Sequence, residues 1–327
     1  MTLDLLFLVG GLIVLVLAGD ALVRGAVNLS LRLGIPSLIV GLTVVAFGTS
    51  APELLVSVKA VLDHAPGIAL GNVVGSNIAN ILLVLGLPAM ISTIHASNGE
   101  TRRSFLTMLA ATVLFMAVAF AGPIRAPHAL ILLAGLGLML WDSYRSARAH
   151  RRALAEAAGE TEEEAEEEER AELEGADPGM PGWQIAVFLA LGLIGLPLGA
   201  DLLVDGAVGI ARILGVSETV IGLTLVAIGT SLPELATCVT AALRRQTDVV
   251  MGNVIGSNIF NLLGIIGVAG LVGPLPVPAQ MLHFDLWAML AASLVLAPIV
   301  LYQRDITRLW GFALLAAYVL FIAAIVS

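Results

Sequence analysis

The chain is poor in charge: only 13% of its 327 residues are Asp, Glu, Lys or Arg, against about 25% in ordinary globular proteins. Hydrophobic residues make up 58% and the mean hydropathy is +0.98, so the charges are too few to cover a water-facing surface. This shortage excludes a soluble enzyme, a nucleic-acid-binding protein and a disordered chain as descriptions of the whole protein. It favours a chain that crosses a membrane many times.

Cysteine and histidine are also scarce. Cys238 is the only cysteine, so an intramolecular disulfide is excluded. All five histidines fall in predicted loops or near predicted span ends, and the sequence has no H-E-x-x-H motif. An intramembrane metalloenzyme would need such ligands, and we therefore expect neither an enzyme nor a bound cofactor. No Lys or Arg precedes the apolar stretch from Leu3 to Ala18, which favours a first transmembrane helix over a cleaved signal peptide.

Apolar stretches of transmembrane length recur along the whole chain. A bilayer core about 30 Å thick requires about 20 apolar residues per helix. The sequence therefore predicts an all-α integral membrane protein with ten transmembrane helices. They lie near 3–19, 37–60, 68–91, 104–121, 126–142, 183–203, 217–242, 248–272, 284–302 and 309–326.

Most of the negative charge is concentrated between the fifth and sixth predicted spans. Residues 142–181 hold thirteen carboxylates and five arginines, and thus contribute −8 to the net charge of −9. We interpret this segment as an acidic soluble linker. A cation-sensing role is the alternative, but the D-x-D-x-D-G pattern of calcium loops is absent from it.

Basic residues predict the orientation. With the N-terminus outside, thirteen of the sixteen Lys and Arg residues lie on the inner side, and three lie on the outer side. Short cytoplasmic loops carry an excess of Lys and Arg. We therefore expect a multi-pass protein of the prokaryotic cell (inner) membrane, with both termini outside and the acidic linker in the cytoplasm.

The sequence contains an internal repeat with an offset of 181 residues. Residues 41–62 match 222–243 at fourteen of 22 positions, and residues 71–87 match 252–268 at ten of 17. Each half then holds five spans, and because five is odd, the halves enter the membrane from opposite sides. Inverted-topology repeats are typical of secondary transporters. The predicted division is 1–141 for the first five-helix repeat, 142–181 for the linker and 182–327 for the second repeat.

Two carboxylates, Glu53 and Glu234, lie mid-span at equivalent positions of the repeats. A charged side chain at the bilayer centre costs about 2.5–3.5 kcal/mol on insertion scales, so such residues are functional candidates. Each helix is interrupted beside its carboxylate by a glycine and a proline, and freed carbonyls at this depth must be buried or line a cavity. The interrupting residues are Gly48, Pro52, Gly229 and Pro233.

Neutral oxygen donors accompany the carboxylates. Thr49 and Thr230 each precede a glutamate by four residues, and could share its helix face or bond to their own helix backbone. The next span of each half carries an amide, a hydroxyl and an amide at intervals of four. For the first amide of each stripe helix packing is an alternative to ion binding. The two stripes are Asn72, Ser76 and Asn80, and Asn253, Ser257 and Asn261.

Oxygen-only ligation selects hard cations and disfavours zinc or copper. With both glutamates ionised the site carries two negative charges, which one Ca²⁺, two Na⁺ or two protons would neutralise. Competition of different cations for one carboxylate pair is a physical basis for antiport. The strings G-T-S-x-P-E and G-N-x-x-G-S-N-x-x-N, each present twice, resemble the α-repeats of the Ca²⁺/cation antiporter superfamily, in its Na⁺/Ca²⁺ exchanger branch. The resemblance is specific over 41–87 and 222–268.

The resemblance implies exchange of cytoplasmic Ca²⁺ for external Na⁺ by alternating access, with the lipid bilayer as surroundings and no obligatory protein partner. It implies a central site at Glu53 and Glu234, and a sliding gate formed by the first span of each half, around Asp20 and Asp201. For these aspartates and Arg24, anchoring at the membrane interface is the alternative. The full set of expected cation ligands is Glu53, Glu234, Thr49, Thr230, Ser76, Ser257, Asn80, Asn261, Ser50 and Ser231, with the carbonyls of Ala46 and Ala227.

Two alternatives to Na⁺/Ca²⁺ exchange remain open. Some relatives, including K⁺-dependent ones, carry Asp where this chain has Asn80 and Asn261, which argues against K⁺ co-transport here. The proton-coupled branch usually carries G-N-x-x-E where this chain has G-T-S, so we rank Na⁺ coupling above a Ca²⁺/H⁺ antiporter. A cation channel ranks lower still, because two facing carboxylates would release Ca²⁺ slowly.

Overall fold

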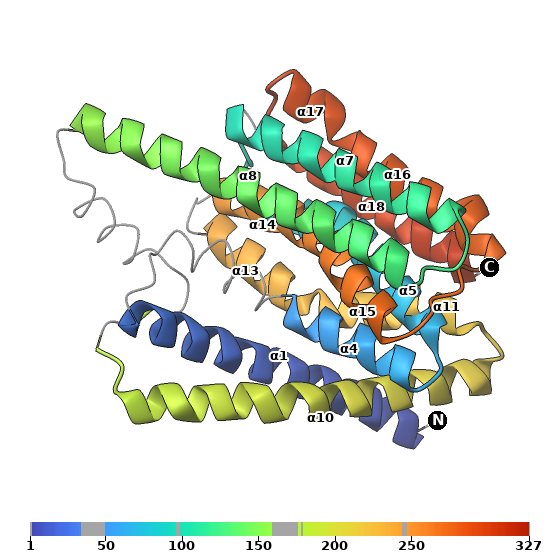
Figure 1. Cartoon of the computed structure of the whole chain (residues 1–327). Helices are drawn as coiled ribbons and strands as arrows, with labels where there is room; N and C mark the ends of the chain where they lie inside the picture. Colours follow the sequence, from blue (N-terminus) through green and yellow to red (C-terminus); the bar gives the residue numbers. More distant parts are fainter. Residues whose placement is uncertain are drawn as a thin grey trace.

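The structure is a computed structural model that describes residues 2–33, 50–95, 99–158, 176–177, 179–243 and 247–326. Within these residues the chain is helical, apart from turns, connecting loops and two isolated β-bridges. The helices run roughly parallel to one common direction, and both chain ends lie at the same end of the bundle (Figure 1). This arrangement is that of an all-helical membrane protein.

The helices fall into two sets that follow the internal repeat. The first set comprises α1 (Thr2–Arg32), α4 (Ala51–Leu62), α5 (Pro66–Ala79), η2 (Asn80–Val84), α6 (Gly86–Ile91), α7 (Gly99–Phe120) and α8 (Ala126–Ala158). The second set comprises α10 (Gly182–Leu214), α11 (Glu218–Ile221), η3 (Gly222–Val226), α12 (Ala227–Thr230), α13 (Leu232–Leu243), α14 (Thr247–Ile259), η4 (Phe260–Ile265), α15 (Ile266–Val272), η5 (Met281–Asp285), α16 (Leu286–Val295), α17 (Ala297–Leu301) and α18 (Arg308–Val326).

Eight continuous helices in the described part of the chain are long and apolar enough to cross a membrane. A ninth crossing is a broken one, in which Glu218–Thr230 and Leu232–Leu243 meet at a bend of 40°. The span predicted near 37–60 is described only from residue 50 onward, so its first part lies outside the described residues. Ten helices therefore stay a prediction, whereas the all-α fold with a broken helix is confirmed.

The first helix of each half is longer than expected. The spans predicted at 3–19 and 183–203 are in fact α1, which runs to Arg32, and α10, which runs to Leu214. Asp20 therefore lies inside a helix, where Arg24 of the next turn neutralises it at 2.9 Å. The fifth span is also longer, because α8 continues to Ala158. The predicted boundary at residue 142 thus falls within a helix, and the division into repeats and linker stays a prediction.

α1 and α10 show that the two halves are inverted. They are equivalent in the repeat, and they lie side by side along one edge of the molecule (Figure 1). A Cβ atom added to Gly206 would lie 2.6 Å from the Leu8 nitrogen, and one added to Gly192 would lie 2.8 Å from the Leu22 Cα. The two backbones are thus in contact through glycines. The earlier residue of α1, Leu8, contacts the later residue of α10, Gly206, and the later Leu22 contacts the earlier Gly192. Equivalent helices therefore run in opposite directions.

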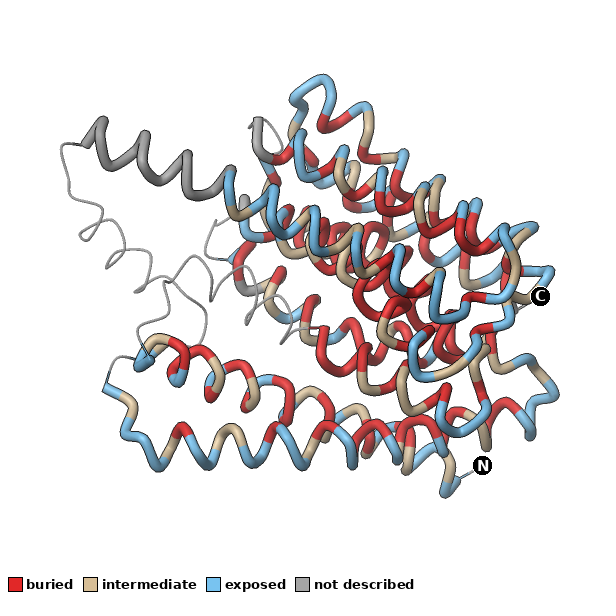
Figure 2. Tube along the Cα trace, viewed as in Figure 1, coloured by how far each residue is buried: buried red, intermediate tan, exposed pale blue. Residues whose placement is uncertain are grey.

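The helices with the polar stripes form the centre of the bundle. Of the most apolar stretch in Pro66–Ile91, 94% of the residues are buried, and 72% in Val249–Val272, whereas the other continuous spans reach only 11–44%. Buried residues accordingly gather in the middle of the bundle, and exposed ones on its outer helices (Figure 2). The apolar outer surface suits lipid, and the protected centre can hold polar groups.

Two β-bridges connect the halves at equivalent places. The backbone groups of Ile94 and Ile306 exchange hydrogen bonds of 3.0 and 2.8 Å, and those of Ile124 and Leu275 exchange two of 2.9 Å. Ile94 and Leu275 are related by the 181-residue offset. In each bridge, a loop of one half pairs with a loop of the other half.

Candidate cation site

Each mid-span glutamate lies in the first turn of a helix that begins at a break. Ser50 precedes α4 with φ −89° and ψ 7°, and Ser231 separates α12 from α13 with φ −81° and ψ 5°. Both serines are followed by a helix that contains Pro at its second position and Glu at its third. The N-terminal end of a helix carries partial positive charge, which favours a carboxylate in the first turn. The break thus stabilises Glu53 and Glu234 inside the bundle.

The polar stripes end in π-helical turns. η2 begins at Asn80, and the Leu85 N–H reaches the Asn80 carbonyl at 3.0 Å, one residue farther than in an α-helix. η4 includes Asn261, the equivalent residue of the second half. Such turns inside α-helices are frequent at functional sites, because they displace backbone and side-chain groups from the regular pattern.

All the described residues of the predicted site are buried. The ten residues other than Ala46 and Thr49 are at most 5% exposed, and both glutamates are 1% exposed. Ala46 and Thr49 lie outside the described residues. The buried ten are Ser50, Glu53, Ser76, Asn80, Ala227, Thr230, Ser231, Glu234, Ser257 and Asn261.

Glycines at Gly75 and Gly222 bring the backbones of the two halves close together beside the site. A Cβ atom added to Gly75 of α5 would lie 2.6 Å from the Leu223 carbonyl oxygen and 2.7 Å from the Ala227 Cβ. Gly222 faces the same seam, where an added Cβ would lie 3.0 Å from the Asn72 nitrogen. Small residues permit such close backbone approach in membrane proteins. The seam places the stripe of α5 against the broken helix that carries Glu234.

The two glutamates lie close enough to interact electrostatically. One hydrogen bond also joins the two halves here: the Thr230 hydroxyl of the second half donates to Asn72 Oδ1 of the first half at 3.0 Å. Asn72 Nδ2 in turn donates to the Glu53 carbonyl at 3.3 Å. The turn that leads into Glu234 is thereby connected to the backbone of Glu53.

Asn72 and Asn253 hold the backbones of the glutamate-bearing helices. Asn72 Nδ2 donates to the Glu53 carbonyl at 3.3 Å and to Ser57 Oγ at 3.1 Å. Asn253 Nδ2 makes the equivalent contacts, to the Glu234 carbonyl at 3.5 Å and to Cys238 Sγ at 3.3 Å. These hydrogen bonds are the helix-packing contacts considered for the two amides. They attach each amide to the helix turn that carries a carboxylate.

A second amide network joins the central helices α5 and α14. Asn80 Nδ2 donates to Asn258 Oδ1 at 3.0 Å, and Asn258 Nδ2 donates to the Asn77 carbonyl at 3.3 Å. Asn77 and Asn258 were missed as candidates by the sequence reasoning. They are the first of the two asparagines in the repeated G-S-N-x-x-N string, so the 181-residue offset was the available signal.

The site contains buried oxygens that no described hydrogen-bond donor reaches. Ten buried side-chain oxygens lack a hydrogen-bond partner within the described residues, and seven of them belong to the predicted ligands. Buried polar atoms are normally hydrogen-bonded, so buried oxygens without a donor on the predicted ligands are suited to binding a cation. For Ser257 no contact with a carboxylate is observed among the described residues. The seven oxygens are Ser50 Oγ, Ser231 Oγ, Glu53 Oε2, Glu234 Oε2, Asn80 Oδ1, Asn261 Oδ1 and Ser76 Oγ.

Known proteins resemble the chain over most of its length. The profile of the family described as sodium/calcium exchanger protein matches residues 3–144 and 184–326. The sodium/calcium exchanger MaX1 of Methanosarcina acetivorans is 34% identical over 345 aligned residues, with 99% of each chain covered. The inner membrane protein YrbG of Escherichia coli K12 is 35% identical over 290 residues, which cover 89% of this chain and 86% of YrbG. The structure of the sodium-calcium exchanger NCX_Mj soaked with 10 mM Na⁺ and 10 mM Sr²⁺ matches with a TM-score of 0.65 at 34% identity, with 98% of both chains covered.

Proposed function

The chain belongs to the sodium/calcium exchanger family, a family of membrane transporters and not of enzymes, and from this premise we propose that it exchanges Ca²⁺ for Na⁺ by alternating access. The cations bind between Glu53 and Glu234. The observation that carries the proposal is a pair of buried carboxylates, together with buried oxygens on predicted ligands of both halves that have no hydrogen-bond partner among the described residues. This arrangement supports a site that is occupied in turn by different cations.

Charge explains why such a site exchanges ions. Two ionised carboxylates buried together in a low dielectric repel each other and have lost their hydration. One Ca²⁺ or two Na⁺ neutralises the pair, whereas the ion-free site stays costly. Moving the site from one side of the membrane to the other is therefore favourable only with cations bound, which couples the flow of one ion to that of the other.

The number of oxygens supports metal ions over protons as the coupled species. Two protons would supply only two O–H donors, one on each carboxyl group, and these are too few for the five neutral oxygens of Ser50, Ser76, Ser231, Asn80 and Asn261 that lack a partner among the described residues. Ca²⁺ takes six to eight oxygen ligands, so neutral oxygens of this kind have a role in binding it. A Ca²⁺/H⁺ antiporter remains the second candidate.

We place the protein in the prokaryotic inner membrane, with both termini outside and the acidic linker in the cytoplasm. The excess of Lys and Arg on one side supports this orientation. The relative YrbG carries the name inner membrane protein. Both described chain ends lie at the same end of the bundle, as an even number of crossings requires (Figure 1).

Calcium uptake into vesicles tests the proposal. Proteoliposomes loaded with Na⁺ and diluted into Na⁺-free buffer should take up radioactive calcium, and Glu53→Gln or Glu234→Gln should abolish the uptake. Collapse of the Na⁺ gradient with a Na⁺ ionophore is the control. Full uptake driven by a proton gradient, without any effect of Na⁺, would instead establish the Ca²⁺/H⁺ antiporter. Single-protein currents would establish a channel.

A further inference from the structure

Asn72 connects both halves of the site through one amide group. It is fully buried in α5. Its Nδ2 donates to the Glu53 carbonyl and to Ser57 Oγ, both in the first half, while its Oδ1 accepts from the Thr230 hydroxyl of the second half at 3.0 Å. A single side chain thus contacts the helix of one carboxylate and a predicted ligand from the opposite repeat.

The chemistry of these partners determines where the protons point. A backbone carbonyl can only accept, so the NH₂ group of Asn72 must face Glu53, and the amide oxygen must face Thr230. An amide oxygen also only accepts, so the Thr230 hydroxyl must donate its single proton to Asn72. The Thr230 oxygen then has only lone pairs to present to its other neighbours.

Thr230 ends the short helix before Glu234, and the same Asn72 amide holds the backbone of Glu53. The lone pairs of the Thr230 oxygen are therefore available beside the turns that carry both carboxylates, where a cation can use them. We propose that Asn72 is a positioning residue that makes Thr230 a cation ligand by occupying its proton. Without Asn72 the hydroxyl could turn its proton toward the site, and its oxygen would be a poorer ligand.

The second half repeats the donor side of this construction with weaker partners. Asn253 holds the Glu234 carbonyl at 3.5 Å, and the position of Ser57 is taken by Cys238, whose sulfur lies 3.3 Å from Asn253 Nδ2. Sulfur is a weaker hydrogen-bond acceptor than a hydroxyl oxygen. The amide of Asn253 is therefore held less firmly than that of Asn72, and replacing it should cost less affinity.

The proposal rests on the proposed function and is tested by comparing variants within one assay. Calcium affinity is measured on purified protein by calorimetry, and exchange is measured by uptake. Asn72→Ala should weaken calcium binding by about tenfold or more, the size found for residues that orient metal ligands. The apparent KM should rise more than the maximal rate falls. The effect of Asn253→Ala should be smaller.

A double-mutant comparison separates positioning from a loss of structure. If Asn72 acts through Thr230, Asn72→Ala should cost much less affinity in a Thr230→Val background than in the wild type, because coupled residues are non-additive. Thr112→Ala is the matched control, since this buried hydroxyl donates at 2.9 Å to the Met108 carbonyl of its own helix and lies outside the predicted ligand set. Equal losses in both backgrounds, or an equal loss for Thr112→Ala, would overturn the proposal. If the wild type itself shows no exchange, the proposed function fails instead.

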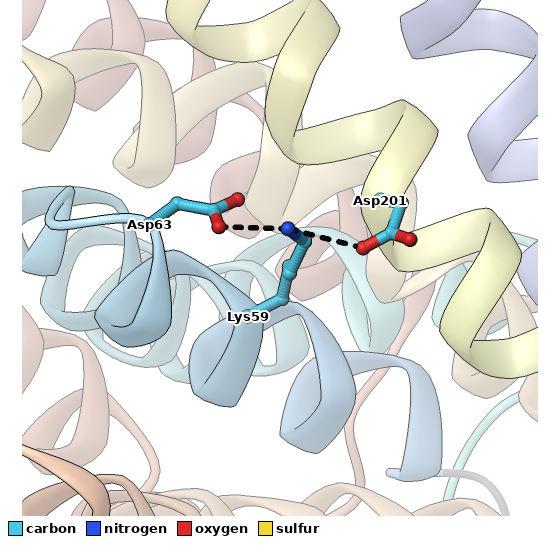
Figure 3. Close-up of polar contacts among 3 residues, drawn as sticks. All are labelled: Lys59, Asp63 and Asp201. Atoms are coloured by element: carbon cyan, nitrogen blue, oxygen red, sulfur yellow. Dashed lines mark hydrogen bonds and ion pairs between the residues drawn. The ribbon is translucent and has the colours of Figure 1, made fainter.

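A separate observation concerns the contact between α10 and α4. Lys59 of α4 lies between two carboxylates, with its Nζ 2.7 Å from Asp63 and 3.2 Å from Asp201 of α10 (Figure 3). Asp63 belongs to the same helix end, whereas Asp201 belongs to the helix pair at the edge of the bundle (Figure 1). Lys59 follows Glu53 by six residues on α4.

The equivalent place in the other half is built differently. The position equivalent to Lys59 in the second half is Thr240, which carries no charge. Asp201 is followed four residues later by Asp205. Its equivalent in α1, Asp20, is followed four residues later by Arg24. Asp20 is accordingly neutralised inside its own helix. We propose that the Lys59–Asp201 ion pair is a latch that holds α10 against the site-bearing helix α4 at one end of the bundle only. It therefore stabilises the arrangement in which α10 lies against α4 at this end, relative to an arrangement in which the pair of helices α1 and α10 has moved away from α4 there.

Spin-label distances between α4 and α10 test the latch. Labels at Leu62→Cys and Leu198→Cys, both exposed positions, are introduced in a Cys238→Ser background. Asp201→Asn should lower the population with the distance of this structure by about two- to fivefold, as expected for a partly exposed ion pair. Lys59 keeps Asp63 as a partner in this variant, so the helix should fold. Lys59→Arg should preserve the population.

Asp20→Asn is the matched control, because its ion pair lies within α1. It should leave the distance between α4 and α10 unchanged. An unaltered distance distribution in Asp201→Asn, or the same shift in Asp20→Asn, would overturn the latch.

Discussion

Asn80 donates a hydrogen bond of 3.0 Å to the side-chain oxygen of Asn258, which is three residues short of its own symmetry mate, Asn261. One N–H of Asn80 is thereby used, which fixes the orientation of the amide, and the amide oxygen is left without a described partner. An amide held in this orientation can present its oxygen to a cation. We expect the same of Thr230, whose proton is taken by Asn72.

Replacing Asn261 by Asp adds a third negative charge to the site. The Asn261 oxygen is buried and has no hydrogen-bond partner among the described residues, so the new carboxylate would need a cation. We expect Asn261→Asp to make Na⁺ dependence steeper or to introduce a dependence on K⁺ or pH. Ion-dependent calcium uptake and the reversal potential of exchange measure this. Unchanged ion dependence with intact activity would show that Asn261 lies outside the site.

Removing one carboxylate should stabilise the ion-free protein and abolish its response to calcium. A ligand that binds only the folded state adds about 2.7 kcal/mol at a free concentration about 100 times its Kd. We expect Ca²⁺ to raise the Tm of the wild type in detergent, and to have little effect on Glu234→Gln. Without Ca²⁺ the variant should melt at or above the wild-type temperature, because a buried charge has been removed. Mg²⁺ serves as the control ion. A full calcium response in the variant would contradict the assignment.

Gly75 is predicted to be intolerant of any side chain. A Cβ there would lie 2.6 Å from the Leu223 carbonyl oxygen, so Gly75→Val must push α5 away from η3. We expect a loss of about 1–3 kcal/mol of stability, together with a loss of calcium affinity because the site spans this seam. Gly137→Val on exposed α8 is the matched control, since nothing lies within 4 Å of its added Cβ. Thermal unfolding and calcium binding should differ between the two variants.

The predicted orientation can be tested with single cysteines in a Cys238→Ser background. Ala165→Cys in the acidic linker should react with a membrane-impermeant maleimide only after the cells are permeabilised. Ser327→Cys at the C-terminus should react in intact cells. Labelling of Ala165→Cys in intact cells would reverse the orientation.

The sequence was sufficient for the helical class, for a physical reason, whereas the ligand set stays a prediction. Apolar runs of membrane length have few alternatives to a helix, and the internal repeat marks pairs of residues that occupy equivalent places. The placement of Glu53 and Glu234 near each other follows from the inversion. Their role in binding Ca²⁺ and Na⁺ remains a proposal.

What the sequence did not predict depends on contacts between remote residues. The extent of α10 beyond Asp201 was missed because its neutralising partner, Lys59, lies on another helix. The sequence predicted only part of the amide network. Asn258 donates to the backbone carbonyl of Asn77, and because every residue has such a carbonyl, the residue type at that position does not reveal the contact. The hydropathy criterion also ended the first span before Asp20, and thus could not anticipate a helix in which Asp20 and Arg24 neutralise each other.

The crosswise bridges between Ile94 and Ile306, and between Ile124 and Leu275, have a consequence for how the protein is assembled. Because each half supplies the strand partner for a loop of the other half, neither half is complete when made alone. The contacts between the halves, and not only the acidic segment that connects them, then hold the molecule together. Two fragments synthesised from separate messages should therefore find each other in the bilayer and reconstitute one transporter.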